Sequence, residues 1–328
     1  MGIRIAATGS YVPERVLTNA DLEKIVDTSD EWIRTRTGIG SRHIAAADEY
    51  TSDLAFAACS RALERGGYSG RDVSAIIVAT TTPDFVFPNT ASLLQRRLGA
   101  EGAFCIDLSS ACTGLISSLE VGIALLAANR RYQRILVCGA EKLSCITDWQ
   151  DRNTCVLFGD GAGAVLLERV DDGTPDTLLA SELHADGSYA EVLSLPGGGS
   201  RHPFSEETLR DRLHYIHMAG RETFKLAVNS MTTACQAVME RAGVSAADLH
   251  LAIPHQANSR IILAVAQRLG LREEQLFMNI EKYGNTSAAS IGICLDEVVT
   301  QGLVSRGDLL LLASFGGGLT WGAMLLRY

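Results

Sequence analysis

The sequence contains one long internal repeat. A helix expected over 57–65 and a strand expected over 75–79 have counterparts in the second half over 233–241 and 249–253. Aligning Phe104 with Phe277 continues the correspondence through one apolar helix and one hydrophobic strand in each half. Two copies of a long α/β unit predict a pair of related domains and not a solenoid, which stacks three or more short repeats.

The later part of each repeat supports a layered arrangement. The apolar helices are expected over 113–128 and 288–301, and the strands that follow them over 135–138 and 309–313. Uninterrupted runs of Ile, Val and Leu are typical of strands that are covered on both faces. We therefore expect an α/β fold whose two halves, 1–172 and 173–328, are related by a pseudo-twofold axis.

The composition indicates an enzyme-sized soluble protein. The 328 residues, 47% of them hydrophobic, suffice for two domains with a substantial core. The N-terminus leads directly into an expected strand and lacks the pattern of a signal peptide. No stretch reaches the ~18 consecutive apolar residues of a membrane-spanning helix. The sequence therefore predicts a cytoplasmic protein that does not bind membranes.

Charge and cysteine spacing exclude two further classes. The net charge of −9 argues against nucleic acid as a partner, because phosphate binding needs a basic surface. The eight cysteines show neither paired spacing nor a histidine pattern, so they predict neither disulfides nor a metal site. They occur at positions 59, 105, 112, 138, 145, 155, 235 and 294.

One cysteine lies at an expected strand-to-helix junction. Cys112 follows the run 103–108, read as a buried strand, and precedes the helix expected over 113–128. The N-terminus of a helix favours a thiolate and lowers the pKa of a nearby thiol. The alternative is a small residue that packs in a tight turn, because most buried cysteines are inert.

Two polar residues occupy related places in the second half. His255 follows the strand expected over 249–253, and Asn285 is aligned with Cys112 by the repeat. Taken singly, the histidine is an ordinary hydrogen-bonded residue and the asparagine a turn or helix cap. Equivalent loops of paired α/β domains meet where ligand sites form. We therefore expect a nucleophile with two hydrogen-bond donors.

These three groups suit acyl transfer between thioesters. A thiolate accepts an acyl group and stores it as an acyl-enzyme. Neutral donors on His255 and Asn285 would hold the carbonyl of a malonyl thioester while carbon dioxide leaves and an enolate forms. Backbone N–H groups of Cys112 and of the turn over 315–318, with Gly317 as the expected donor, would form a separate oxyanion hole. This chemistry needs no metal.

Along essentially its whole length the chain resembles β-ketoacyl-acyl-carrier-protein synthase III, an initiating condensing enzyme of type II fatty-acid synthesis in the thiolase superfamily. The motifs that carry this resemblance are Asp27–Ile33, Arg36–Ile39, Ser110–Gly114, Phe158–Gly163, Pro254–Asn258, Tyr283–Ser287 and Phe315–Trp321. The resemblance implies a thiolase-like, duplicated, five-layered α-β-α-β-α fold. It makes Cys112, His255 and Asn285 catalytic.

The resemblance also implies the reaction. A short-chain acyl-CoA, with acetyl-CoA as the expected donor, would condense with malonyl-acyl-carrier protein through an acyl-Cys112 intermediate. The products would be a β-ketoacyl-acyl-carrier protein, carbon dioxide and coenzyme A. No cofactor is implied, because coenzyme A enters as a thioester substrate.

Several further residues are assigned by the resemblance alone. Trp32 and Arg152 would sandwich the adenine of coenzyme A, Thr28 and Arg36 would contact its nucleotide, and Gly220 and Asn258 would line the pantetheine channel. Stacking on an indole and a guanidinium suits a base. Packed inward, Trp32 would be an ordinary helix residue.

Partner contacts follow from the same resemblance. Phe87 would close the acyl pocket across the interface of a homodimer. The acidic carrier protein would dock on a local basic patch at the tunnel mouth, formed by Lys225, Arg221, Arg260 and Arg268. The alternative for each of these cations is a solvated helix face.

Two glycine-rich segments are interpreted differently. The run 159–163 lies between segments 154–157 and 164–167, both read as strands, so it predicts a bend and not a phosphate-binding loop. The polar stretch 197–212 is longer than an ordinary loop and is interpreted as an insertion near the substrate entrance.

Two other functions remain open at this point. The same site fits a secondary-metabolism paralogue that makes a polyketide starter, a quinolone precursor or an acyl ester. The third reading is a catalytically silent partner subunit, which has no chemical need for an intact Cys112, His255 and Asn285. Primer length and branching depend on pocket contacts that the sequence does not specify.

Overall fold

Two sheets form the framework of the structure, a computed structural model that describes residues 2–170, 173 and 177–328. The first sheet has the order β1 (Gly2–Tyr11), β7 (Gly161–Val170), β6 (Arg134–Glu141), β4 (Ala75–Ala79) and β5 (Phe104–Leu108). The second has the order β11 (Leu251–Pro254), β12 (Leu309–Gly316), β13 (Thr320–Arg327) and β8 (Leu178–Ala185).

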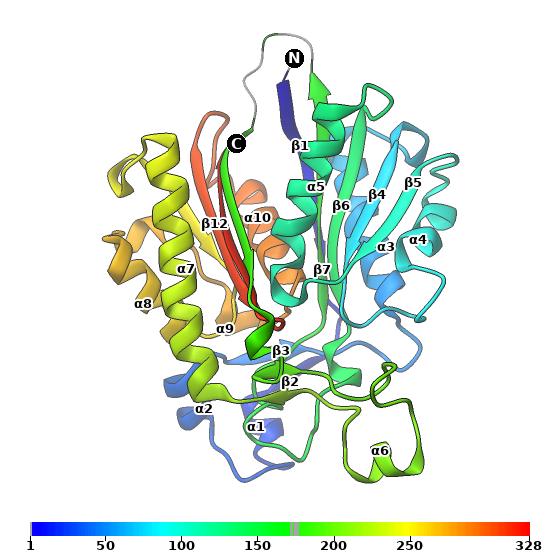
Figure 1. The fold of residues 1–328 in the computed structure, drawn as a ribbon, viewed down its shortest axis with the longest axis vertical. Coiled ribbons are helices and arrows are strands. Elements are labelled where there is room, and N and C mark those ends of the chain that lie inside the picture. The colour runs from blue at the N-terminus through cyan, green and yellow to red at the C-terminus, as the bar shows by residue number, and fades with distance from the viewer. Residues whose placement is uncertain (1, 171–172, 174–176) are drawn as a thin grey trace.

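Helices separate and cover these sheets, which gives five layers (Figure 1). The central layer consists of α5 (Gly114–Ala128) and α10 (Ala289–Thr300). The outer layers are α3 (Thr51–Gly66) with α4 (Thr90–Leu98), and α7 (Gly220–Ala242) with α8 (Ser259–Leu269). The expected α-β-α-β-α order is therefore confirmed.

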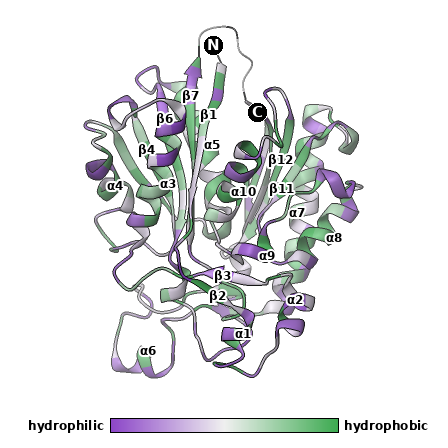
Figure 2. Ribbon diagram, turned by 180° about the vertical axis from the view of Figure 1, so that it is seen from behind, coloured by the Kyte–Doolittle hydropathy of each residue, from purple (hydrophilic) through white to green (hydrophobic). Residues whose placement is uncertain are grey.

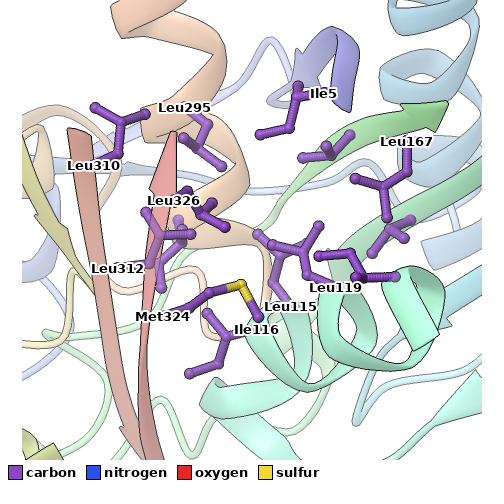
Figure 3. Packing of buried hydrophobic residues seen from close by; sticks show 14 of the residues in the cluster. Ile5, Leu115, Ile116, Leu119, Leu167, Leu295, Leu310, Leu312, Met324 and Leu326 are labelled. Atoms are coloured by element: carbon purple, nitrogen blue, oxygen red, sulfur yellow. The ribbon is translucent and has the colours of Figure 1, made fainter. Parts of the chain in front are cut away.

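The main core lies between the two sheets. Both sheets and both central helices contribute apolar side chains to it (Figure 3). Those labelled in the figure are Ile5, Leu115, Ile116, Leu119, Leu167, Leu295, Leu310, Leu312, Met324 and Leu326. Hydrophobic residues concentrate in the strands and central helices, and hydrophilic ones on the outer helices (Figure 2). Burying such side chains contributes about 1.5–3 kcal/mol each.

The repeat is visible in the strand order. In the second sheet β8, β13, β12 and β11 follow one another as β1, β7, β6 and β4 do in the first. The predicted boundary between residues 172 and 173 stays a prediction, because residue 172 lies outside the described residues.

The counterpart of β5 in the second half is reduced to a single parallel bridge between Leu276 and Ala252 of β11, so the expected correspondence holds only in part. The described chain after Phe277 turns into the short helix α9 (Ile280–Tyr283). The Gln256 side chain explains this, because its Oε1 accepts hydrogen bonds from the backbone N–H groups of Asn279 and Ile280. Those donors are then not available to a strand.

Two strand predictions need correction. The run over 103–108 is not fully buried, because β5 is a sheet edge at which Phe104 and Ile106 are exposed. Residues 154–157 form turns, because the backbone carbonyl of Asp151 accepts hydrogen bonds from Thr154 and Cys155 and its carboxylate accepts one from Asn153. Of the bend expected over 159–163, only 159–160 precede the strand β7, which contains 161–163; as expected, no helix follows.

One helical segment has the length and composition of a membrane span. The 18 residues Ala111–Ala128 have a mean hydropathy of 1.8, and half of this window is buried. The sequence analysis expected no segment of this kind, and that expectation is wrong as far as length and composition are concerned. Since α5 packs against strands of both sheets, its apolar composition is that of a core helix, and one such helix is weak evidence for a membrane.

Smaller elements close one end of the layers (Figure 1). They are β2 (Val16–Thr18), α1 (Asn19–Leu22), α2 (Asp30–Thr37), β3 (Ser41–His43), β9 (Leu193–Ser194), α6 (Glu206–Arg210) and β10 (His217–Met218). The polar stretch 197–212 contains α6 and lies between the paired strands β9 and β10.

Candidate active site

A cavity of about 680 Å³ opens where the two halves meet. Cys112, His255 and Asn285 all line it, as the repeat predicted. Among the residues that the structure describes, no cluster of His, Cys, Asp or Glu is arranged to hold a metal ion. All eight cysteines are free. The candidate site consists of Cys112, His255, Asn285 and the residues that surround them.

Cys112 is held in a tight backbone environment before α5. It lies in a single 3-10 turn (Ala111–Thr113), and Ala111 has a φ of 44°. The Ser314 hydroxyl donates to the Cys112 carbonyl at 2.7 Å. A Cβ on Gly316 would lie 2.7 Å from the Cys112 nitrogen, so only glycine allows this approach. The sulfur position is thereby fixed by backbone packing.

The protonation state of Cys112 differs from the expectation. Burial raises the pKa of the Cys112 thiol to about 12. A hydrogen bond with Ser287 acts in the opposite direction. The N-terminus of α5 also favours a thiolate, but desolvation of a buried sulfur is the larger effect. The free enzyme therefore holds a thiol.

His255 is a buried, neutral imidazole at the end of β11. Its backbone N–H donates to the Ala313 carbonyl at 2.7 Å, and its Nδ1 lies 2.6 Å from the Ser290 hydroxyl. Burial lowers the pKa of His255 to about 3. The Ser290 oxygen also accepts from the Gln256 backbone N–H at 3.4 Å, so its own hydrogen is available to Nδ1. Nε2–H then acts as a donor.

This depressed pKa predicts acid sensitivity of the fold. The pKa of His255 is about 3 in the native state and 6.5 ordinarily. At pH values between these two, the unfolded chain binds a proton that the native state does not. Unfolding free energy therefore falls on acidification by up to ~1.4 kcal/mol per pH unit. From pH 6.5 to pH 5, urea unfolding should show about 2 kcal/mol more loss for the wild type than for His255→Gln. Equal losses would contradict this assignment.

Asn285 has a fixed side-chain orientation. Its backbone pairs with the segment before β7, donating to Leu157 and accepting from Gly159. Its side-chain Oδ1 accepts from the Ser287 backbone N–H at 2.9 Å. This bond assigns the acceptor end of the amide and leaves the Nδ2 hydrogens for a ligand. His255 and Asn285 are therefore two neutral donors, as expected.

The predicted coenzyme A residues lie on one side of the cavity. Trp32, Arg36, Gly220 and Asn258 line it, whereas Thr28 and Arg152 lie outside its lining. The Arg152 guanidinium lies 4.7 Å from the centre of the Trp32 ring. A base placed between them would require the two side chains to separate.

Neighbouring groups orient the residues of this side. Asn258 caps α8, accepting from the Arg260 backbone N–H and donating to the Arg36 carbonyl. The Thr28 hydroxyl is buried and makes no hydrogen bond within the described chain, so it is free for a ligand. Gly220 begins α7.

The four predicted docking cations lie on or beside the same face. Arg221 and Arg260 line the cavity, and Arg260 lies over the Phe224 ring at 5.5 Å. Lys225 and Arg268 are exposed on α7 and α8 outside the lining, and Arg268 donates to Asn229.

Two other predicted residues lie away from the cavity lining. Phe87 is 85% exposed, and Gly317 packs against the Leu193 carbonyl. Of the residues that the structure describes, none in 197–212 lines the cavity, although Leu193 and Met218 of the strands on either side of this stretch do. The lining therefore does not support the expectation that 197–212 shapes the entrance.

Sequence reasoning missed the groups that surround the three side chains. Ser290 orients His255, Ser314 and Gly316 hold the Cys112 backbone, and Ser287 contacts the Cys112 thiol. Ser287 and Ser290 lie within five residues of Asn285, at the start of an apolar helix. Polar residues at that place were the signal by which the sequence could have indicated them.

Comparison with known proteins identifies the family. Two models match, "3-Oxoacyl-[acyl-carrier-protein (ACP)] synthase III" over residues 106–187 and its C-terminal part over 239–328. The chain is 50% identical over 324 residues to β-ketoacyl-[acyl-carrier-protein] synthase III of Caldanaerobacter subterraneus, covering 99% of this chain and 97% of that one.

Solved structures agree with the sequence matches. The crystal structure of 3-oxoacyl-[acyl-carrier-protein] synthase III from Aquifex aeolicus superposes with a TM-score of 0.91 at 49% identity, covering 100% of both chains. The priming β-ketosynthase of the R1128 polyketide pathway also has a TM-score of 0.91, at 32% identity, covering 99% of this chain and 96% of that one. Because half-identical relatives match over essentially full length, this chain belongs to the 3-oxoacyl-[acyl-carrier-protein] synthase III family.

Proposed function

We propose that this enzyme condenses a short-chain acyl-CoA, with acetyl-CoA as the expected donor, with malonyl-acyl-carrier protein and thereby initiates fatty-acid synthesis. The observation that carries the proposal is the meeting of a cysteine and two neutral donors, His255 and Asn285, in one cavity. The products are a β-ketoacyl-acyl-carrier protein, carbon dioxide and coenzyme A.

In the first half-reaction the Cys112 sulfur attacks the thioester carbonyl of the acyl-CoA. A carbon–sulfur bond forms to Cys112, and coenzyme A leaves with the proton that the thiol gives up. The developing oxyanion is held by backbone N–H groups of Cys112 and Gly317, the arrangement expected from the sequence. The close approach of Gly316 to Cys112 supports this, since it brings the 315–318 turn beside the sulfur.

In the second half-reaction the malonyl thioester carbonyl accepts hydrogen bonds from His255 and Asn285. Loss of carbon dioxide places charge on that oxygen, and the resulting enolate carbon attacks the acyl-Cys112 carbonyl. The carbon–sulfur bond to Cys112 then breaks, the β-ketoacyl-acyl-carrier protein is released, and the Cys112 sulfur takes up a proton to restore the thiol. A neutral histidine suits this role, because its pKa of about 3 keeps it uncharged and donating at physiological pH. No metal or cofactor takes part; coenzyme A is a substrate.

Coenzyme A is proposed to enter along the face that carries Trp32, Arg36, Gly220 and Asn258. Adenine would stack between Trp32 and Arg152 once these separate, and the unpartnered Thr28 hydroxyl would contact the nucleotide.

The carrier protein is proposed to dock on Arg221, Lys225, Arg260 and Arg268 at the cavity mouth. This chain is acidic overall, at −9, so attraction of an acidic partner depends on this local patch. Such binding weakens with salt, because exposed charges are screened.

Arg260→Glu should raise the KM for malonyl-acyl-carrier protein at least tenfold and leave acylation by acyl-CoA within about twofold. Separate assays of acylation and condensation measure the two effects. The matched control is Arg130→Glu, the same charge change beyond the far end of α5 from Cys112. An equal drop in acylation would show that Arg260 is structural.

A homodimer is proposed on the edge of the first sheet. Phe85, Val86 and Phe87 are 56%, 91% and 85% exposed, and the neighbouring edge strand β5 exposes Phe104 and Ile106. An apolar loop beside an unpaired sheet edge fits a second copy, whose Phe87 would reach the acyl pocket. Sedimentation should give twice the mass of 35.1 kDa; a monomer would contradict the interface.

A second function fits the same residues. The likeness to a polyketide priming β-ketosynthase favours a secondary-metabolism paralogue with another primer or acceptor. Acceptor specificity separates the two. A silent subunit is disfavoured, because all three reactive side chains are present in the cavity. We also propose a cytoplasmic location for this enzyme, as expected from the sequence.

A further inference from the structure

A buried carboxyl without a cation lies at the end of β6. Glu141 is fully buried, and no ion pair involves it among the described residues. Its Oε2 accepts from the Thr81 backbone N–H and from the hydroxyls of Thr80, Thr81 and Thr82, at 3.0, 3.3, 3.0 and 2.9 Å. Its Oε1 is buried and has no hydrogen-bond partner in the described chain. An orphaned polar atom of this kind is costly and requires an explanation.

This carboxyl lies near the place where three elements that surround the nucleophile meet. The backbone of β6 contacts the segment after Asn285 so closely that a Cβ on Gly139 would lie 2.2 Å from the Ala288 carbonyl oxygen. A Cβ on Gly114 would lie 3.2 Å from the Ala288 Cβ. The end of β6, the start of α10 and the start of α5 therefore meet at Ala288.

Ser287 connects the two groups. It is buried, and its φ of 46° is unusual for a residue other than glycine. Its side chain lowers the pKa of both the Cys112 thiol and the Glu141 carboxyl, which places it beside both groups. Strained backbone of this kind persists where the surroundings hold it, often beside a reactive group.

We propose that Glu141 carries a proton on Oε1 and that this O–H, which has no partner in the described chain, donates to the Ser287 hydroxyl when that hydroxyl turns to donate a hydrogen bond to the Cys112 sulfur. Glu141 is then a positioning residue that acts through Ser287. The chain of two donors stabilises the sulfur's negative charge during acyl transfer, which a carboxylate in the same place would oppose. This proposal rests on the nucleophilic role proposed for Cys112.

The surroundings favour the neutral carboxyl. Burial raises the pKa of Glu141, and the nearest cation, Lys142, directs its Nζ to backbone carbonyls of residues 46, 47 and 49. The other titratable groups near this end of β6 are Asp160, which is buried with a raised pKa, and the Cys145 thiol, whose pKa is raised to about 11. His255, across the cavity, is neutral. No neighbour therefore neutralises a charge on Glu141.

The first test is the rate of Cys112 alkylation by iodoacetamide at pH 8, measured by intact-protein mass. Ser287→Ala should slow this alkylation about tenfold, because loss of a hydrogen-bond donor to the sulfur lowers the fraction of thiolate about tenfold at a pH below the pKa of the thiol. This variant keeps the Cβ and so does not change the backbone strain. Glu141→Gln should stay within about twofold of the wild type, because its amide still donates to Ser287.

Three results would overturn the proposal. If the Glu141→Gln variant is alkylated ten times faster than the wild type, Glu141 is ionised in the wild type and repels the thiolate. An unchanged alkylation rate in Ser287→Ala would show that Ser287 donates no hydrogen bond to the Cys112 sulfur. In the second test, infrared spectra at pH 8 should show a carboxylic-acid carbonyl band that Glu141→Gln lacks, and the absence of that difference would also refute it. Alkylation needs no acyl donor, so these outcomes are distinct from a failure of the proposed condensation.

Discussion

Cys112→Ala should form no acyl-enzyme with any acyl-CoA and should lose condensation by more than about 10⁴-fold. The substitution removes the atom that accepts the acyl group, and no other cysteine lines the cavity in the part of the chain that the structure describes. Intact-protein mass after incubation with acyl-CoA measures the adduct directly. The fold should be unaffected, because the Cys112 backbone is held by Ser314 and Gly316 and not by its thiol.

A matched variant isolates this effect. Cys145→Ala removes an exposed thiol outside the cavity and should leave the adduct intact. Cys112→Ala should also retain slow decarboxylation of malonyl-acyl-carrier protein, since His255 and Asn285 remain. An acyl adduct that persists in Cys112→Ala would move the nucleophile elsewhere.

Asn285→Ala should leave acylation within a few-fold of the wild type and reduce condensation by about 10²–10³-fold. Its Nδ2 hydrogens are proposed to act on the malonyl carbonyl only in the second half-reaction. Single-turnover acylation and release of carbon dioxide measure the two steps separately. Equal loss in both steps would refute this division of roles.

Asn285→Asp provides the structural control. Aspartate keeps an oxygen for the Ser287 backbone N–H, which Asn285 Oδ1 accepts, but cannot donate to a carbonyl when ionised. Condensation should therefore be lost in this variant as well. Recovery of condensation in Asn285→Asp would show that the loss in Asn285→Ala comes from the altered backbone.

Several features of the site follow from local sequence patterns. The repeat aligns Cys112 with Asn285, and the segments that precede α5 and α10 in the chain bring the two residues to one cavity. Apolar runs over 113–128 and 288–301 predicted the central helices, because a helix between two sheets is covered on both sides. The layer order was therefore accessible from the sequence.

What sequence patterns did not reveal depends on three-dimensional surroundings. The pKa of Cys112 rises because the thiol is desolvated, whereas the sequence showed only the favourable helix terminus. The counterpart of β5 is shortened to one bridge, at Leu276, because the Gln256 side chain forms hydrogen bonds to Asn279 and Ile280 further along the chain. Glu141 is likewise unremarkable in the sequence, and only its burial beside Ser287 draws attention to it.

The measurement that tests the central proposal most directly is intact-protein mass after incubation with a panel of acyl-CoAs, followed by a chase with malonyl-acyl-carrier protein. The account predicts a short acyl adduct on Cys112 that the chase converts to a β-ketoacyl-acyl-carrier protein, and the donor that reacts fastest identifies the primer. An adduct that persists through the chase would contradict the initiating role and favour another acceptor. No adduct with any donor would contradict catalysis by Cys112 altogether.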